Sequence, residues 1–398
     1  MIRRLQQSFS KLSAGRASTV QTLIIILLLG VAAAPSAQAQ TFSTLYTFKS
    51  TPDGQTPFAG LIQDSAGNVY GTTFYGGASF AGVVFKVNTK GTESVLYNFT
   101  GTTDGAYPYA PLLLDKAGNL YGTAYLGGGS NLGVVFKVDG SGTETVLYSF
   151  EGGTADGCYP AAGLIADASG NLYGTTSSCG ASNYGTVFKL TTGGQETTLH
   201  SFAGGSADGA SPYYGRLLMD ASGNLIGLTS YGGANSSGVL FKLSSAGKLT
   251  LLHSFAGGSK DGCYPYGTAA MDKTGNFYGT TEECGSAAFG TVWKVSAKGA
   301  VTLLHSFTGA KSDGGYPFAG VAMDTTGNLY GDTASGGATL YGVLYKLSKA
   351  GKLTLLHSFS STSGAIPFGP ILRNTKGAIY GTTEGSGEGG YGSVWSFK

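Results

Sequence analysis

Residues 61–73 have the sequence Leu-Ile-Gln-Asp-Ser-Ala-Gly-Asn-Val-Tyr-Gly-Thr-Thr, and variants of this stretch return along the 398-residue chain. Two markers keep the same spacing of roughly fifty residues, which is the period of a tandem structural repeat. They are the glycine of a Gly-Asn or Gly-Ala pair (Gly67, Gly118, Gly170, Gly223, Gly275, Gly327 and Gly377) and a loop proline (Pro57, Pro108, Pro160, Pro212, Pro265, Pro317 and Pro367). Because both markers give seven copies independently, the chain is a sevenfold repeat.

Each repeat is expected to form four short strands. In the first copy, apolar and β-branched runs bounded by glycine turns predict strands over residues 61–64, 69–73, 83–87 and 94–99. Four antiparallel strands per unit, without helical periodicity, are typical of propeller blades. A blade is apolar on both faces, so a linear array would leave two such faces bare, whereas a ring covers them all. We therefore predict an all-β fold, a seven-bladed β-propeller with four antiparallel strands per blade.

The two ends of the chain predict how this ring closes. Residues 41–48 contain Leu-Tyr-Thr-Phe, which matches the fourth strand of the repeat, whereas residues 392–397 match its third strand. The last blade therefore lacks an outer strand, and the N-terminus has one to spare. We expect residues 41–48 to pair with residues 394–397, so that the N-terminal strand completes the last blade.

The N-terminus also carries a targeting signal. Four basic residues precede the apolar run of residues 23–34, and Ala-Gln-Ala at 37–39 follows as a cleavage pattern. The run is too short to span a bilayer comfortably. We predict a signal peptide over residues 1–39 and a single propeller domain over 40–398, secreted or periplasmic, with no membrane insertion after cleavage.

Charge argues against a polyanionic partner. Residues 1–39 hold four of the 24 basic residues and none of the 22 acidic ones, which leaves 20 basic against 22 acidic residues and a net charge of −2. Nucleic-acid binding needs a basic footprint that this balance does not offer, so no nucleic-acid partner is expected. The mature protein is expected to be a monomer.

Four pieces of the repeat carry a resemblance to a known family. They are Leu-Tyr-Gly-Thr at 120–123, Val-Val-Phe-Lys at 134–137, Leu-His-Ser-Phe at 252–255 and Asp-Gly-Cys-Tyr-Pro at 261–265. Together they resemble the GloVer tandem repeat of exported bacterial proteins, and the resemblance covers essentially the whole mature chain. It implies export and a propeller-like fold, and it implies no established activity.

The cysteines occur in two matched pairs. Only the third and fifth copies contain them, one in Asp-Gly-Cys-Tyr-Pro and the other 21 residues later in the glycine-rich loop. Both loops should lie on the same rim of one blade, so we predict the disulfides Cys158–Cys179 and Cys263–Cys284, consistent with an oxidising compartment. The alternative is a zinc site, which would need cysteines from non-adjacent blades to converge.

Most residues that could do chemistry repeat with the fold. The four histidines, His200, His253, His305 and His357, share one repeat position, filled elsewhere by tyrosine, and are expected to serve packing or hydrogen bonding. The aspartates before the Gly-Asn turns, from Asp64 to Asp324, are expected to cap those turns. The loop Asp-Gly pairs from Asp53 to Asp313 are expected to be turns too, and a Ca²⁺ role for them stays open. No other metal, no cofactor and no catalytic residue is expected.

Differences between copies point to a site. The residue that opens the inner strand is aromatic in six copies, which would ring one mouth of the channel: Phe58, Tyr109, Tyr214, Tyr266, Phe318 and Phe368. The third copy has Ala161 there. The fourth copy has an extra residue and places Arg216 where other copies have Gly, Pro or Thr, and Glu282, Glu283 and Glu384 belong to the same rim. These groups could stack on and hydrogen-bond a sugar. The alternative is that the aromatic side chains simply plug the channel.

We therefore predict an exported binding or scaffold propeller whose partner is a carbohydrate or a protein. One alternative is a polysaccharide-active enzyme, a lyase or hydrolase at the channel mouth, which uses Arg216 with Glu282, Glu283 or Glu384. Another is a purely structural component of the cell envelope.

Overall fold

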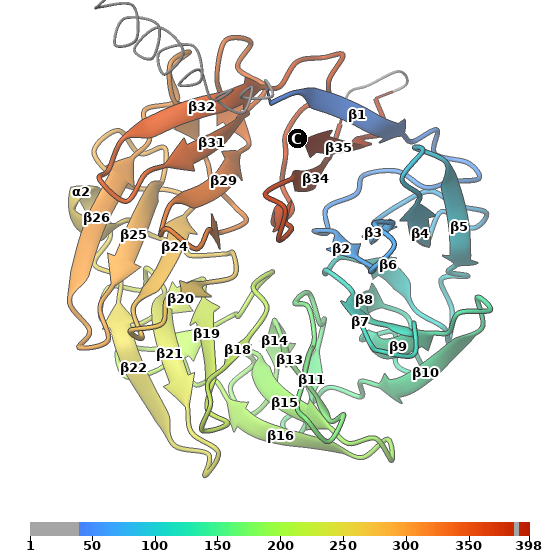
Figure 1. Cartoon of the computed structure of the whole chain (residues 1–398). Helices are drawn as coiled ribbons and strands as arrows, with labels where there is room; N and C mark the ends of the chain where they lie inside the picture. Colours follow the sequence, from blue (N-terminus) through green and yellow to red (C-terminus); the bar gives the residue numbers. More distant parts are fainter. Residues whose placement is uncertain (1–39, 386–389) are drawn as a thin grey trace, which may run out of the picture. The chain divides into compact units, whose positions relative to one another are not determined.

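The computed structural model describes residues 40–385 and 390–398, so the predicted signal peptide over residues 1–39 lies outside the described residues. Residues Phe42–Lys398 form one compact unit. Within it, seven antiparallel sheets are the blades of a ring (Figure 1), six with four strands and one with an additional short fifth strand, which confirms the predicted all-β, seven-bladed propeller.

The strands of each blade, from the inner to the outer one, follow the repeat. They are β2 (Ile62–Gln63), β3 (Val69–Thr73), β4 (Val83–Val87) and β5 (Glu93–Asn98) in blade 1; β7 (Leu113–Leu114), β8 (Leu120–Leu126), β9 (Val134–Val138) and β10 (Glu144–Ser149) in blade 2; β12 (Ile165–Ala166), β13 (Leu172–Thr176), β15 (Thr186–Leu190) and β16 (Glu196–Ser201) in blade 3; β18 (Leu218–Met219), β19 (Leu225–Thr229), β21 (Val239–Leu243) and β22 (Leu249–Ser254) in blade 4; β23 (Ala270–Met271), β24 (Phe277–Thr281), β25 (Thr291–Val295) and β26 (Val301–Ser306) in blade 5; β28 (Ala322–Met323), β29 (Leu329–Thr333), β31 (Val343–Leu347) and β32 (Leu353–Ser358) in blade 6; and β33 (Leu372–Arg373), β34 (Ile379–Thr383), β35 (Ser393–Phe397) and β1 (Phe42–Thr47) in blade 7.

Among the described residues, seven short strands and one short helix lie in the segments between these strands. They are β6 (Ala106–Pro108), β11 (Gly157–Cys158), β14 (Ser178–Cys179), β17 (Gly209–Ala210), β20 (Tyr231–Gly232), β27 (Gly314–Gly315), β30 (Ser335–Gly336) and the four-residue helix α2 (Gly258–Asp261).

The ring closes as the chain ends predict. Strand β1 pairs antiparallel with β35, with Phe42 opposite Phe397 and Ser43 opposite Ser396. Beyond the strand, Phe48 N–H donates to the Gly392 carbonyl at 3.0 Å. The N-terminal strand is therefore the outer strand of the last blade.

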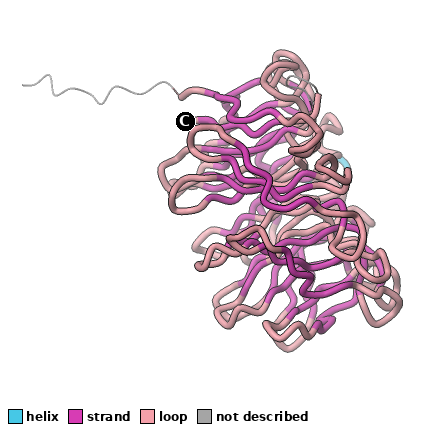
Figure 2. Tube along the Cα trace, turned by 90° about the vertical axis from the view of Figure 1, so that its right-hand side faces the viewer, coloured by secondary structure: helices cyan, strands magenta, loops and turns pink. Residues whose placement is uncertain are grey.

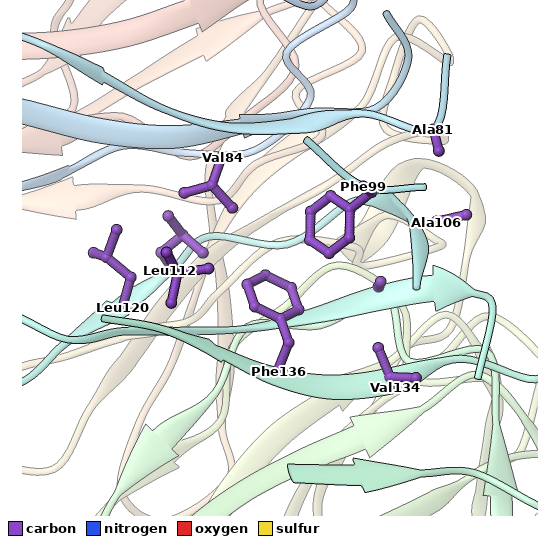
Figure 3. Close-up of a cluster of buried hydrophobic side chains, with 10 residues drawn as sticks. Ala81, Val84, Phe99, Ala106, Leu112, Leu120, Val134 and Phe136 are labelled. Carbon is purple, nitrogen blue, oxygen red and sulfur yellow. The ribbon is translucent and has the colours of Figure 1, made fainter. Parts of the chain in front are cut away.

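The core lies between neighbouring blades. In each boundary a fully buried phenylalanine after the outer strand packs edge-on against an aromatic ring in the third strand of the next blade, as Phe99 does against Phe136 at 5.0 Å between ring centroids. Figure 3 shows this pair with the aliphatic side chains around it, such as Val84 and Leu112. At the closing boundary Phe48 packs against Phe85 at the same distance. Because the contact repeats at every boundary, each blade depends on both neighbours for its burial.

A polar pair also repeats around the outside of the ring. The Tyr or His of the outer strand bonds to the buried loop aspartate that follows it, as Tyr97 donates to Asp104 at 2.8 Å and His253 bonds to Asp261 at 2.9 Å. His357 differs, because its partner is Ser363 and it stacks on Phe42; burial lowers the pKa of His357 to about 4. The histidines thus serve hydrogen bonding, as expected.

The turn aspartates are structural, as predicted. Asp64 accepts from the backbone and side-chain amides of Asn68 at 2.9 and 2.7 Å and from the Tyr70 hydroxyl at 2.9 Å. Burial opposes ionisation of Asp64, but these hydrogen bonds lower its pKa overall.

The two faces of the ring differ in what they carry. The tight turns after the first and third strands of each blade lie on one side, here called the turn face. The loops after the second strands and the segments that join successive blades lie on the other, here called the loop face. Figure 2 shows the strands of the unit between these two sets of connections.

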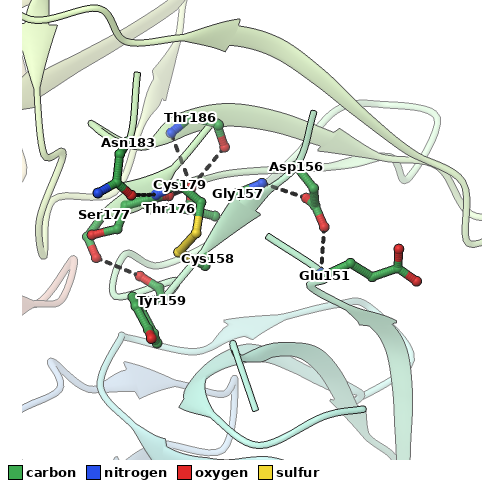
Figure 4. The surroundings of a disulfide bond; sticks show 11 residues. Glu151, Asp156, Gly157, Cys158, Tyr159, Thr176, Ser177, Cys179, Asn183 and Thr186 are labelled. Carbon is green, nitrogen blue, oxygen red and sulfur yellow. Dashed lines mark hydrogen bonds between the residues drawn. A yellow bond between two sulfur atoms is a disulfide. The ribbon is translucent and has the colours of Figure 1, made fainter. Parts of the chain in front are cut away.

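Both predicted disulfides are present on the loop face. Cys158 and Cys179 are bonded, as are Cys263 and Cys284, and no cysteine is free. Figure 4 shows that the first bond joins β11 to β14, beside the hydrogen-bonded Thr176 and Thr186 hydroxyls. The zinc alternative is therefore wrong for these four residues.

Candidate functional site

The six predicted aromatic side chains meet at the channel axis. Phe58 stacks on Tyr109 at 4.9 Å, and Phe368 lies 4.4 Å from Phe318 and 5.1 Å from Phe58, measured between ring centroids. The cavity among them is only about 10 Å³, room for no more than about one water molecule. We call Phe58, Tyr109, Tyr214, Tyr266, Phe318 and Phe368 the aromatic plug. Whether its loop-face surface binds a ligand stays a prediction.

The extra residue of the fourth copy completes this plug. Tyr214 has a left-handed backbone, with φ of 52°, which is uncommon for a bulky residue and costs local strain. Its ring reaches across the axis to within 4.6 Å of Tyr109 and 5.6 Å of Phe368. The third copy contributes only the small, fully buried Ala161. The insertion in one blade therefore compensates for the missing ring of its neighbour.

Arg216 lies behind the plug rather than on the rim. Its backbone N–H donates to Thr268 Oγ1 at 2.9 Å, and its guanidinium donates to the Leu112 carbonyl at 3.0 Å. A Cβ on Gly163 would lie 3.3 Å from Arg216 Nε, so the glycine of blade 3 leaves room for the side chain to pass. Arg216 is thus separated by the aromatic rings from the glutamates with which the sequence grouped it.

The three glutamates lie on the loop face at the ends of second strands. Glu282 and Glu384 are half-buried, and both raise the pKa of Tyr214, after the larger effect of burial. Burial, with a smaller contribution from the charge of Glu283, raises the pKa of Glu282 to about 7. Glu283 is exposed, and its backbone pairs with that of Cys263. Two half-buried carboxyl groups with raised pKa values, Glu282 and Glu384, therefore flank the plug on this face.

Two further aromatic residues beside the plug, Phe74 and Tyr125, were not anticipated. Phe74 directly follows β3, and Tyr125 is the penultimate residue of β8, both at the repeat position of Glu282 and Glu384. Phe74 packs on Tyr109 at 5.2 Å, and the Tyr125 and Tyr213 hydroxyls lie 3.2 Å apart. Their shared position with the glutamates was visible in the alignment of the copies, which would have identified them.

The loop face also holds most of the exposed large apolar side chains. Among the described residues, eight of the nine with substantial exposure lie there: Tyr75, Phe80, Tyr184, Tyr231, Leu340, Tyr341, Ile366 and Tyr391. Met271, on the turn face, is the exception. One side of the ring is therefore unusually rich in accessible tyrosine.

One of these tyrosines, Tyr231, lies near the plug between blades 4 and 5, beside two less exposed tyrosines. The Tyr231 ring lies 5.2 Å from that of Tyr264, and Tyr231 is 44% exposed. Burial, the charge of Glu282 and an interaction with Tyr231 all raise the pKa of Tyr266. We call Tyr231, Tyr264, Tyr266 and Glu282 the blade 4–5 cluster.

Blade 6 contains a buried ionisable pair unrelated to this face. Asp332 occupies a position that is Thr in five other copies, and its Oδ2 atom has no hydrogen-bond partner. The Tyr345 hydroxyl, also buried, has none either. Burial raises the pKa of Asp332 to about 8 and raises that of Tyr345 as well. Asp332 is therefore protonated at neutral pH.

Metal and membrane features can be stated for the part of the chain that the structure describes. Within residues 40–385 and 390–398, no group of three or more His, Cys, Asp or Glu side chains is arranged to hold a metal ion. The Ca²⁺ role stays an open prediction. Over the same residues, no helix is long and apolar enough to cross a membrane.

Comparisons with known proteins place the repeat and the fold. The family model of the Gloeobacter/Verrucomicrobia repeat matches twice, over residues 34–217 and 213–398, which confirms the predicted resemblance. No curated protein sequence matches the chain.

Among solved structures, the extracellular domain of a putative one-component system from B. thetaiotaomicron has a TM-score of 0.57 at 11% identity. The match covers 89% of this chain and 40% of that one. A gluconolactonase from Xanthomonas campestris has a TM-score of 0.46 at 14% identity, over 79% of this chain and 90% of that one. The first similarity shows only that the two proteins share a fold, and the second is too weak to support a conclusion about this chain.

Proposed function

The chain belongs to the Gloeobacter/Verrucomicrobia repeat family, and from this premise we propose that it is an exported, non-catalytic binding propeller that holds carbohydrate on its loop face. Export is supported by the signal-like N-terminus and by two disulfides, which persist in oxidising compartments. The similar solved domain is itself extracellular.

The concentration of exposed tyrosine on one face carries the proposal. Tyrosine presents a flat apolar ring and a hydroxyl, so it can stack on the apolar side of a sugar ring and bond to its hydroxyls. Eight of the nine strongly exposed large apolar side chains of the described residues lie on this one face, and such a concentration favours an interaction site. The loop face therefore has the chemistry of a carbohydrate-binding surface.

The blade 4–5 cluster is the proposed centre of this surface. The accessible ring of Tyr231 supplies a stacking platform beside Tyr264. Glu282 supplies carboxyl oxygens and lies close enough to Tyr266 for each to affect the other's pKa. A stacked sugar would thus meet hydrogen-bonding groups at the edge of the same platform.

Binding to a glycan array tests this proposal. We expect the mature protein to bind at least one polysaccharide class, and we expect Tyr231→Ser and Glu282→Gln each to weaken that binding about tenfold or more. Met271→Ser, which removes a similarly exposed apolar side chain on the turn face, is the matched control and should retain binding. Binding to no glycan would contradict the proposal and leave a protein partner or a structural role.

A second candidate function rests on the two glutamates beside Tyr214. Glycoside chemistry uses two carboxyl groups, one with a raised pKa that serves as general acid, and Glu282 has such a pKa. Glu384, whose pKa burial also raises, would be the partner. This alternative predicts release of reducing sugar from a bound polysaccharide and its loss in Glu282→Gln. Binding without any product would exclude it.

A further inference from the structure

A second cavity lies behind the aromatic plug, within the channel itself. Its volume is about 230 Å³, and six blades line it with residues one to four positions beyond the plug, where the chain leads into the inner strands. The walls are mostly aliphatic, with Leu61, Val321 and Ile371 among them. With about 30 Å³ for each water molecule, the space accommodates at least roughly eight non-hydrogen atoms. Because the plug is closed, this cavity is distinct from the loop face.

Arg216 is the charged residue of this cavity. Among the described residues, its guanidinium has a single hydrogen-bond acceptor, the Leu112 carbonyl, and no carboxylate lies within ion-pair distance. An arginine has five N–H donors, so most of them have no protein acceptor. The other copies place the uncharged residues Gly60, Pro111, Gly163, Thr268, Gly320 and Pro370 at this position.

The positive charge of Arg216 in this cavity is not balanced by a carboxylate of the described residues. Burial lowers the pKa of Arg216, since the surrounding apolar atoms disfavour its charge. Arg216 is partly buried and has no counter-charge from the described residues, so an anion bound beside it would gain a favourable electrostatic interaction. A guanidinium is also the side chain best suited to grip a carboxylate with two parallel hydrogen bonds.

We propose that this channel cavity binds a small organic monocarboxylate, with the carboxylate on Arg216 and the hydrocarbon part against the aliphatic walls. A single positive charge matches a monoanion, whereas a phosphate dianion would bring an excess of negative charge into apolar surroundings. The site is independent of the proposed carbohydrate surface, because the plug separates the two.

Hexanoate, with eight non-hydrogen atoms, is a suitable probe, and hexanamide is its uncharged counterpart. We expect titration calorimetry to detect hexanoate binding and thermal denaturation to show a midpoint that rises with hexanoate concentration. Arg216→Met should weaken binding about tenfold or more. Arg373→Met is the control, because Arg373 stacks on Tyr330 at 4.9 Å, outside the cavity, and should bind as the unaltered protein does.

Two further measurements keep the proposal falsifiable. Val321→Phe fills the cavity and retains Arg216, so it should abolish hexanoate binding even if Arg216→Met folds poorly. Without carboxylate, Arg216→Met should unfold at a temperature no lower than the unaltered protein, since it removes an uncompensated charge. A hexanoate response that is absent in the unaltered protein, unchanged in Arg216→Met, or equal for hexanamide would overturn the proposal. A marked fall in the unfolding temperature of Arg216→Met would also overturn the proposal, because it would show that Arg216 stabilises the fold through its hydrogen bond to the Leu112 carbonyl.

Discussion

Replacing Asp332 with threonine should stabilise the protein, and the gain should grow with pH. Asp332 is fully buried in blade 6 with an unbonded Oδ2 atom. In three other copies the threonine hydroxyl at this position donates to a carbonyl of the next blade, as Thr382 does to Ala59 at 3.1 Å. An unsatisfied buried polar group costs about 1–3 kcal/mol. Asp332→Thr should recover a free energy of that order.

The pH dependence follows from the raised pKa of Asp332. The folded value is about 8, against 3.8 for the model carboxyl that represents the unfolded chain. Between these values the unfolded chain has lost the proton and the folded protein retains it, so stability falls as pH rises. The slope is at most about 1.4 kcal/mol per pH unit, and no further loss is expected above pH 8. The free-energy difference between variant and unaltered protein should therefore widen from pH 5 to pH 8.

Urea denaturation at pH 5, 6.5 and 8 measures this difference. Other carboxyl groups with raised pKa values, such as Glu93 and Glu144, are present in both proteins. Their contribution to the pH dependence therefore cancels when the two unfolding free energies are subtracted. The converse variant, Thr280→Asp in blade 5, is the matched control and should lose stability with the same direction of pH dependence. Parallel pH profiles for Asp332→Thr and the unaltered protein would refute the reasoning.

Two other predictions concern what holds the ring. Phe48→Ala should lower the free energy of unfolding in urea by about 3–5 kcal/mol, because Phe48 is fully buried against the first blade. Phe80→Ala is the control and should change this free energy little, because Phe80 is 58% exposed. Equal effects of the two substitutions would contradict the packing of Phe48 between blades. The double variant Cys158→Ser/Cys179→Ser should lose about 3 kcal/mol. An unchanged thermal midpoint would show that this disulfide does not contribute to stability.

The fold could be predicted from the sequence because seven copies repeat the same local signals. Turn glycines and alternating apolar residues specify strands, and their repetition indicates blades. The surplus strand at the N-terminus then specified the closure. The disulfides were predictable because the two cysteines occur only together, in loops that every copy brings to the same rim.

The site could be predicted only in part, since the direction of a side chain does not follow from its place in a repeat. The six aromatic residues do share one mouth, but the closeness of their rings depends on the backbone of Tyr214, which an insertion alone does not specify. Arg216 passes behind the plug because Gly163 leaves space in another blade. The partners of the loop aspartates were also missed, although Tyr97 and Asp104 show the spacing that joins them.

Closure of the ring is the claim on which both proposed sites depend, and one engineered bond tests it. Ser43 lies opposite Ser396 in the β1–β35 pair, where Cα atoms of facing residues are about 4.5–5.5 Å apart, within reach of a disulfide. We predict that the Ser43→Cys/Ser396→Cys variant forms this bond spontaneously, so that mass spectrometry of the unreduced protein finds the two terminal peptides linked. The Ser43→Cys/Ser393→Cys variant, three residues out of register, should retain two free thiols. Free thiols in the first variant, or equal linkage in both, would contradict the closed propeller.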